Sequence, residues 1–254
     1  MTGGGTPAFA RGYNRSVASL PPVAPVDVSE TALALCRAGR RFDERGWVLG
    51  TSGNFSALLN RNPLRLVITP SAAFKGELAP EQLLEMDERG RVVRGGAPGA
   101  RPSAEALLHV EIVRSRGAGA VLHTHSIWST LVSDLYGDDG GVEIAGYEML
   151  KGLDGVTTHE HREWLPIVEN DQDIPRLSEV VGGVLSSHPA AHGFLLRRHG
   201  LYTWGAGLRD AVRHVEILEF LMETIARRAA AGSHRGSSAP PHDQRTERSD
   251  TWPS

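Results

Sequence analysis

The sequence predicts a layered α/β domain, because segments with the pattern of strands alternate along the chain with segments that have helical spacing. Hydrophobic residues make up 40% of the 254 residues, enough to build a proper core. No Gly-x-Gly-x-x-Gly sequence follows the first expected strand, which argues against a dinucleotide-binding domain. The length suits one domain of about 200 residues or two small ones.

In the first half of the chain, helical spacing begins near Ser29, which has the character of an N-cap. Gly46 has the position of a C-terminal glycine and closes this helix. The other elements expected in this half are a buried strand over 65–69, a short helix over 80–86, and a longer helix over 103–117 with Ser103 as its cap.

The second half begins with an apolar run that predicts a strand ending in two histidines. The last helix has the clearest pattern, with apolar residues spaced by three and four between Ala211 and Ile225. Between these two elements we expect a helix over 126–135, a helical turn over 146–153 and a strand over 164–168. A second helix from 173 and two strands over 193–198 and 201–204 complete this half.

Composition divides the chain into three parts. We predict a flexible N-terminal arm over residues 1–27, a catalytic domain over 28–231 and a disordered C-terminal tail over 232–254. The net charge of -3 gives no pull towards nucleic acid or an anionic membrane. Cys36 is the only cysteine, which excludes an internal disulfide framework, so we expect a cytoplasmic enzyme with neither nucleic-acid nor membrane partners.

The stretch from Ala120 to Ser126 is the first candidate site. Successive side chains of a strand point to opposite faces, so His123 and His125 point the same way. Two imidazoles on one face can share a zinc ion, although tight binding needs a third ligand. The alternative is a hydrogen-bonded, inert pair of histidines at a strand end.

His199 is the candidate third ligand, because it lies beside a glycine at the end of another apolar strand. Three imidazoles with an open fourth position are typical of a catalytic zinc site. His159 and His161 also form a His-x-His pair, but no apolar run precedes them. We interpret this second pair as part of a loop.

Two glutamates are candidates for acid–base chemistry. Glu105 lies in the first turn of an expected helix, where the helix dipole alone accounts for a negative charge. Glu148 is a lone acid in a mostly apolar segment. Such surroundings disfavour the ionised form and suit a general acid near neutral pH, although a solvated helix-face glutamate is the alternative.

The turn Gly50-Thr51-Ser52-Gly53-Asn54 offers backbone N–H groups, hydroxyls and an amide. Such a turn can cradle a phosphate, particularly if Lys75 and the hydroxyls of Ser71 and Ser103 converge on it. Turns use these residue types in any case, so the pattern alone carries little weight.

Taken together, five short segments resemble the motif series of the class II aldolase/adducin family. The resemblance covers about residues 29–228 and rests on residues 50–54, 68–71, 102–105, 123–125 and 199–200. It implies a three-layer α/β/α domain around a mainly antiparallel sheet, a homotetramer, and a small-molecule sugar-phosphate substrate. It also implies Zn2+ held by His123, His125 and His199.

Segments 146–152, 165–170 and 199–205 are similar to the dehydratases of this family that act on 5-methylthioribulose 1-phosphate in methionine salvage. That resemblance implies loss of water to give 2,3-diketo-5-methylthiopentyl 1-phosphate. An aldolase that cleaves a short sugar phosphate is the alternative, and a non-catalytic adducin-like domain is a third interpretation.

The resemblance also assigns roles to single residues. It places Glu148 as the acid or base and Glu105 near the metal, and it does not decide which of the two removes the C3 proton. The positions that match the family's phosphate pocket are Ser52, Asn54, Ser71 and Ser103. Ala72 and Ala104 depart from the glycine and serine of the aldolases, so no contacts are assigned to them.

Overall fold

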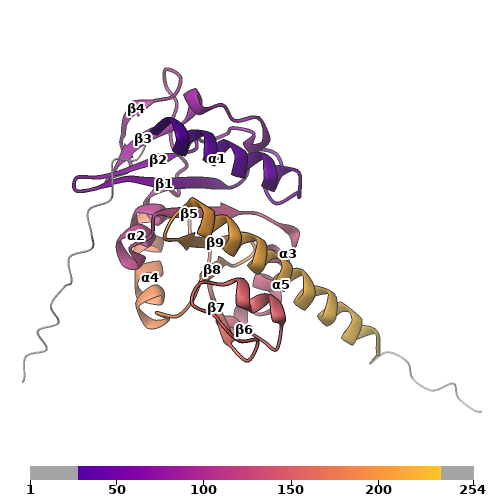
Figure 1. Cartoon of the computed structure of the whole chain (residues 1–254). Coiled ribbons are helices and arrows are strands. Elements are labelled where there is room, and N and C mark those ends of the chain that lie inside the picture. Colours follow the sequence, from indigo (N-terminus) through magenta and orange to yellow (C-terminus); the bar gives the residue numbers. More distant parts are fainter. Residues whose placement is uncertain (1–27, 236–254) are drawn as a thin grey trace, which may run out of the picture.

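One nine-stranded sheet runs through the centre of the molecule in the order β4-β3-β2-β1-β5-β9-β8-β7-β6 (Figure 1). The computed structural model describes residues 28–235. Neighbouring strands are antiparallel except β7 and β8, so the expectation of a mainly antiparallel sheet is confirmed. The strands are β1 (Asn54–Arg61), β2 (Leu64–Ile68), β3 (Leu84–Asp87), β4 (Val92–Gly95), β5 (Ala120–Thr124), β6 (Gly141–Ala145), β7 (Arg162–Val168), β8 (Gly193–Leu196) and β9 (Gly200–Gly205).

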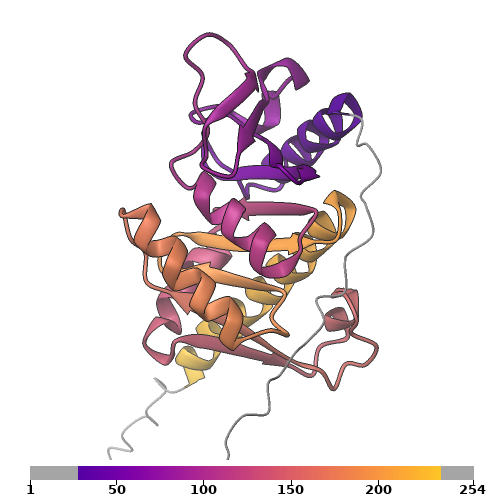
Figure 2. The same ribbon diagram turned by 90° about the vertical axis from the view of Figure 1, so that its left-hand side faces the viewer.

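Helices cover both faces of the sheet, which gives the three layers that the resemblance implies (Figure 2). Helices α2 and α4 pack against each other on one face, and α1, α3 and α5 lie on the other. The helices are α1 (Val28–Asp43), α2 (Ala106–Arg116), α3 (Ile127–Leu135), α4 (Ile174–Ser187) and α5 (Leu208–Arg235), and single 3-10 turns are η1 (Lys75–Glu77), η2 (Pro80–Gln82), η3 (Gly137–Asp139) and η4 (Glu148–Gly152).

Strand β5 is buried along its whole length because it is central and has helices on both faces. Its side chains alternate: Val121 packs in the core beneath α2 and α4, whereas Ala120 and Leu122 pack beneath α1 and α5. By the same alternation, His123 faces the α2 layer and Thr124 faces α5. This assignment determines what each side chain contacts.

Several element predictions are confirmed by local capping. Ser126 is the N-cap of α3 and accepts a hydrogen bond from the Ser129 N–H, and Asp173 caps α4 in the same way through Arg176. Gly117 ends α2 in the left-handed conformation, with φ 62°. The predicted cap Ser103 is wrong, because α2 begins at Ala106 with Glu105 as its N-cap, and the Ser103 hydroxyl instead accepts from the Glu105 N–H before the helix.

Other element predictions are wrong. The short helix expected over 80–86 is limited to η2, and β3 follows it because Leu84 and Met86 alternate into the core beside β2. Helix α1 begins at Val28, before the proposed cap Ser29. Helix α5 continues to Arg235, past the point where the tail was expected to begin. The expected arm over 1–27 and the tail beyond 235 lie outside the described residues.

Gly200 provides a test of this packing, because a Cβ atom there would lie 2.1 Å from the Thr124 carbonyl oxygen and 3.1 Å from His123 Cε1. We expect Gly200→Ala to lower the free energy of unfolding by roughly 1–3 kcal/mol, measured by urea denaturation in the presence of a chelator. Gly183→Ala is the matched control, since nothing lies within 4 Å of its Cβ position and alanine favours helix α4. Equal stability of the two variants would contradict the packing argument.

Candidate active site

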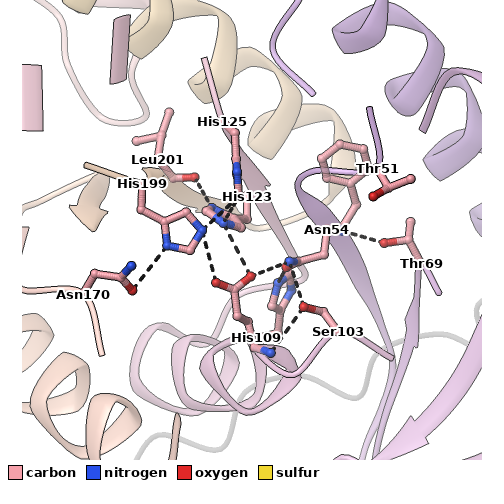
Figure 3. A network of polar contacts seen from close by, with 12 residues as sticks. Thr51, Asn54, Thr69, Ser103, His109, His123, His125, Asn170, His199 and Leu201 are labelled. Carbon is pink, nitrogen blue, oxygen red and sulfur yellow. Dashed lines mark hydrogen bonds and ion pairs between the residues drawn. The ribbon is translucent and has the colours of Figure 1, made fainter. Parts of the chain in front are cut away.

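Three histidines meet where β5 and β8 end and β9 begins (Figure 3). His123 lies on β5, His125 follows that strand, and His199 lies in the turn between β8 and β9. Arg198 in this turn has φ 55°, a conformation that reverses the chain within three residues. Gly200 then lets β9 approach β5 at backbone contact.

The ring nitrogens of the three labelled histidines converge in Figure 3, and the carboxylate of Glu105 lies within the same group. His125 Nε2 lies 2.7 Å from His123 Nε2 and 3.1 Å from His199 Nε2. Glu105 Oε2 is 3.6 Å from His123 Nε2, and Glu105 Oε1 is 3.3 Å from His199 Nε2. The structure therefore brings together all three histidines and one of the two glutamates that the sequence singles out.

The donor set fits a divalent cation. Burial, together with the neighbouring histidines, holds the pKa of His123 well below its ordinary value and lowers that of His125 to about 4, so both imidazoles are neutral. His123 Nδ1 donates to the Leu201 carbonyl at 2.9 Å, which leaves the Nε2 lone pair free to bind a metal. Nitrogens bound to one tetrahedral zinc at roughly 2.1 Å lie about 3.4 Å apart, so small ring movements would admit the ion.

A series of hydrogen bonds between side chains fixes the position of the Glu105 carboxylate. Asn54 Nδ2 donates to Glu105 Oε2 at 2.8 Å and contacts the Ser103 hydroxyl at 3.3 Å. Burial lowers the pKa of His109 to about 3, so its neutral ring donates from Nε2 to Asn54 Oδ1 and accepts at Nδ1 from Ser56. His109 therefore fixes the orientation of the Asn54 amide, which in turn directs an N–H at the carboxylate.

Sequence reasoning missed His109, Asn170 and Tyr202. The Tyr202 ring stacks on His123 with centroids 3.8 Å apart and an interplanar angle of 11°. Asn170 Oδ1 lies 3.4 Å from His199 Nδ1. His109 had a usable signal, because it follows Glu105 by four residues and so lies on the same helix face. Tyr202 and Asn170 had none, since their positions depend on strand pairing.

Of the other proposed phosphate residues, Ser52 lies in the Gly50–Asn54 turn and Lys75 contacts it. Gly53 has φ +72°, and a Cβ atom there would lie 2.6 Å from the His123 carbonyl, so glycine is required beside β5. The Lys75 ammonium donates to the carbonyls of Thr51 and Ala73, and burial lowers its pKa to about 8. The buried hydroxyl of Ser52 has no hydrogen-bond partner among the described residues. Ser71, by contrast, is exposed.

Glu148 lies outside this group of residues. Its side chain is 72% exposed and pairs with Lys151 Nζ at 2.6 Å, and this hydrogen bond lowers its pKa. The expectation that apolar surroundings disfavour its ionised form is therefore wrong for the single chain. Leu150 and Leu153 turn into the core, whereas η4 directs Glu148 into solvent.

On the opposite face of β5, Glu219 of α5 supports the histidine-bearing segment. The Thr124 hydroxyl donates to Glu219 Oε1 at 2.8 Å, and the Ser126 hydroxyl donates to Glu219 Oε2. These two residues flank His125 in the sequence. Their contacts with one buried carboxyl group fix the backbone from which both histidines project.

The comparisons with known proteins identify the family. Residues 33–226 match the family described as Class II Aldolase and Adducin N-terminal domain. The chain belongs to this family. A protein of Methylococcus capsulatus named methylthioribulose-1-phosphate dehydratase is 46% identical over 197 residues, 77% of this chain and 93% of that protein. A protein of the same name from Pseudomonas aeruginosa is 46% identical over 73% of this chain and 88% of its own.

Solved structures of the family have the same fold. YgbL from Escherichia coli superposes with a TM-score of 0.65 at 27% identity and covers 78% of this chain and 89% of its own. L-fuculose-1-phosphate aldolase from Thermus thermophilus superposes with a TM-score of 0.63 at 21% identity, and the match covers 82% of this chain and 99% of that protein. The family resemblance read from the sequence is thus confirmed. Among the described helices, none combines the length and apolar character needed to cross a membrane.

Glu219 generates a prediction about stability and pH. Burial raises its pKa from 4.5 to about 7, against the hydrogen bonds from Ser126 and Thr124. An acid whose pKa is raised on folding stabilises the fold below its unfolded pKa and loses that contribution as pH rises towards 7. The free energy of unfolding of the unchanged chain should therefore fall by up to about 3 kcal/mol relative to that of Glu219→Gln as the pH rises from 4.5 to 7. This figure uses about 1.36 kcal/mol per pKa unit.

Chemical denaturation at several pH values measures this difference. Glu179→Gln is the control, since it changes an exposed glutamate on helix α4 and leaves Glu219 and its neighbours in place. It should retain the slope of the unchanged chain. A Glu219→Gln variant with that same slope would refute the assignment.

Proposed function

We propose that this chain removes water from 5-methylthioribulose 1-phosphate to give 2,3-diketo-5-methylthiopentyl 1-phosphate, the reaction of a hydro-lyase in methionine salvage. The observation that carries the proposal is the identity of 43–46% to proteins named methylthioribulose-1-phosphate dehydratase over about nine-tenths of their length. The convergence of three imidazoles with a carboxylate supports it, because the reaction needs an acidified C3–H bond and a proton acceptor.

The metal in this proposal is Zn2+, held by His123, His125 and His199. Three imidazole ligands leave a fourth coordination position for substrate. When bound, zinc supplies Lewis-acid stabilisation of the negative charge that develops on the substrate oxygens. Imidazoles also suit other divalent ions, so metal analysis is part of the test.

Glu105 has the position of the base in this scheme. Its carboxylate borders the three histidines and accepts a hydrogen bond from the Asn54 amide, while the Ser103 hydroxyl accepts from the Glu105 backbone N–H. It takes the C3 proton, the electrons of the C3–H bond form a C2=C3 double bond, and the C2 oxygen takes the negative charge of the resulting enediolate. The C4–oxygen bond then breaks as the leaving hydroxyl receives a proton, and tautomerisation gives the diketone.

Glu148 is the proposed donor of that proton. Because it is exposed on η4 and lies outside the histidine group of its own chain, we infer that it acts at the site of a neighbouring copy. This is consistent with a homotetramer in which adjacent copies complete each other's sites. Contact with a neighbour would also bury the carboxyl group and raise its pKa.

The phosphate of the substrate is assigned to the Gly50–Asn54 turn. The free hydroxyl of Ser52 and the hydroxyls of Ser103, which contacts Asn54, and Ser71 are its proposed donors. Lys75 lies behind the turn, where its charge favours an anion while its hydrogen bonds hold the loop. Asn54 is a weaker candidate as a direct contact, since both ends of its amide are already used.

An aldolase reaction is the alternative, because the same base and metal could cleave C3–C4 instead of C4–O. Incubation with 5-methylthioribulose 1-phosphate, followed by mass spectrometry, separates the two. Dehydration lowers the substrate mass by that of one water, whereas cleavage yields an aldehyde and a shorter ketose phosphate. Aldehyde release without dehydration would refute the dehydratase proposal.

We expect Glu148→Gln to lower kcat by at least about 100-fold while retaining the metal, since a missing general acid costs roughly 10²–10⁴-fold. Glu160→Gln alters another exposed glutamate in the same region and should retain full activity. Steady-state kinetics and metal analysis on both variants are the measurements. Normal turnover by Glu148→Gln would remove this residue from the mechanism.

His199→Gln tests the metal assignment directly. The side chain is only partly buried, so the variant should fold, yet it should bind about one equivalent of metal less than the unchanged chain. Inductively coupled plasma mass spectrometry of the purified proteins measures the loss. His188→Gln, which changes a histidine outside the group, should keep the full content.

A further inference from the structure

A second group of potential metal ligands lies away from the active site. His161, Glu163 and His192 each place one ligand atom within 4.8 Å of the others. His161 directly precedes β7, Glu163 lies on β7, and His192 directly precedes β8. Because β7 and β8 run parallel, the beginnings of both strands lie at the same end of the sheet. This parallel pair is what brings two distant segments together.

The three side chains converge on one carboxylate oxygen. Glu163 Oε2 is 2.8 Å from His161 Nε2 and 2.9 Å from His192 Nδ1. The Glu163 side chain is only 1% exposed, and its other oxygen accepts from the His192 backbone N–H at 2.8 Å. A buried carboxylate needs a compensating cation, and two imidazole nitrogens beside it supply the remaining ligands for one.

The second ring nitrogen of His192 is already oriented. His192 Nε2 lies 2.8 Å from the Asp154 carbonyl, to which it donates, so Nδ1 can present a lone pair towards Glu163. The neighbouring His214 is committed elsewhere, since its Nδ1 donates to the Trp204 carbonyl and its Nε2 accepts from the Asp154 N–H. The ligand set is therefore limited to two nitrogens and one carboxylate oxygen.

A cavity of about 580 Å³ borders this group and is lined in part by His161, His192 and His214. It provides a path for an ion and space for a water molecule as fourth ligand. Two histidines, one glutamate and one open position form a set that zinc uses in enzymes.

This group is separate from the active site. His192 and His199 lie at opposite ends of β8, and the two groups share no residue. The cavity also reaches Ala118 before β5 and Ala206 after β9, at the far end of both strands from His125. Occupation of one group by a metal therefore does not require occupation of the other.

We propose that His161, Glu163 and His192 form a second binding site for a divalent cation that prefers imidazole ligands, with Zn2+ as the probe. The ion ties the start of β7 to the start of β8 and replaces the proton that would otherwise link Glu163 to His192. Its role is to stabilise this end of the sheet.

The test is the zinc stoichiometry of the full chain, stripped with a chelator, re-equilibrated with Zn2+ near pH 8 and freed of excess ion. We expect two zinc ions per unchanged chain and one in His161→Gln. The His161 side chain is 26% exposed at the cavity rim, so this variant should fold, and Glu163→Gln serves as the second variant. His159→Gln, an exposed histidine two residues away, should keep both ions.

His199→Gln distinguishes this proposal from that for the active site. It should lose the active-site zinc only, and zinc should still raise its Tm, by roughly 5 °C at about 100-fold excess over Kd. The double variant with His161→Gln should show no such rise. If the unchanged chain binds one zinc and His199→Gln binds none, the proposal of a second site is overturned and that of the first site stands. Two zinc ions in His161→Gln would also overturn it.

Discussion

The alternation of side chains along β5 is the constraint on which the active site depends. Because the strand is central and covered on both faces, each of its residues must suit one of two environments. His123 faces the layer that carries Glu105 and His109, whereas Thr124 faces Glu219. A shift of one residue in register would exchange these faces and separate the histidines from the carboxylate. The polar contacts on both sides thus protect a single register.

Sequence reasoning reached the residues whose placement follows from local structure. His123 and His125 share a face because any strand alternates, and Ser126 and Asp173 cap helices because their neighbours are helical. It failed where placement depends on distant segments. The environment of Glu148 could not be judged from its apolar neighbours, since one turn directs some side chains inward and others outward. His192 lies beside the buried Glu163 only because β7 and β8 pair in parallel, and this pairing turns the local contact of His161 with Glu163 into a group of three.

The two histidine groups differ in what holds them together. In the active site, three imidazole nitrogens face one another, an arrangement in which all three can bind one cation. At Glu163, each imidazole faces a carboxylate oxygen instead, an arrangement that a proton can also stabilise. The first group is therefore arranged to receive a metal ion, whereas the second can exchange one kind of cation for another.

Helix α5 links parts of the molecule that would otherwise be independent. Glu219 on this helix anchors the segment that carries His123 and His125, and Ile217, two residues earlier, packs so closely on Gly152 that a Cβ atom there would lie 2.4 Å away. Gly152 ends the turn that carries Glu148. Helix α5 thus sets the spacing between the end of β5, which carries the histidines, and the turn η4, which carries Glu148. A substitution that shifts α5 along its axis would therefore displace both segments together, even though they contact different residues of the helix.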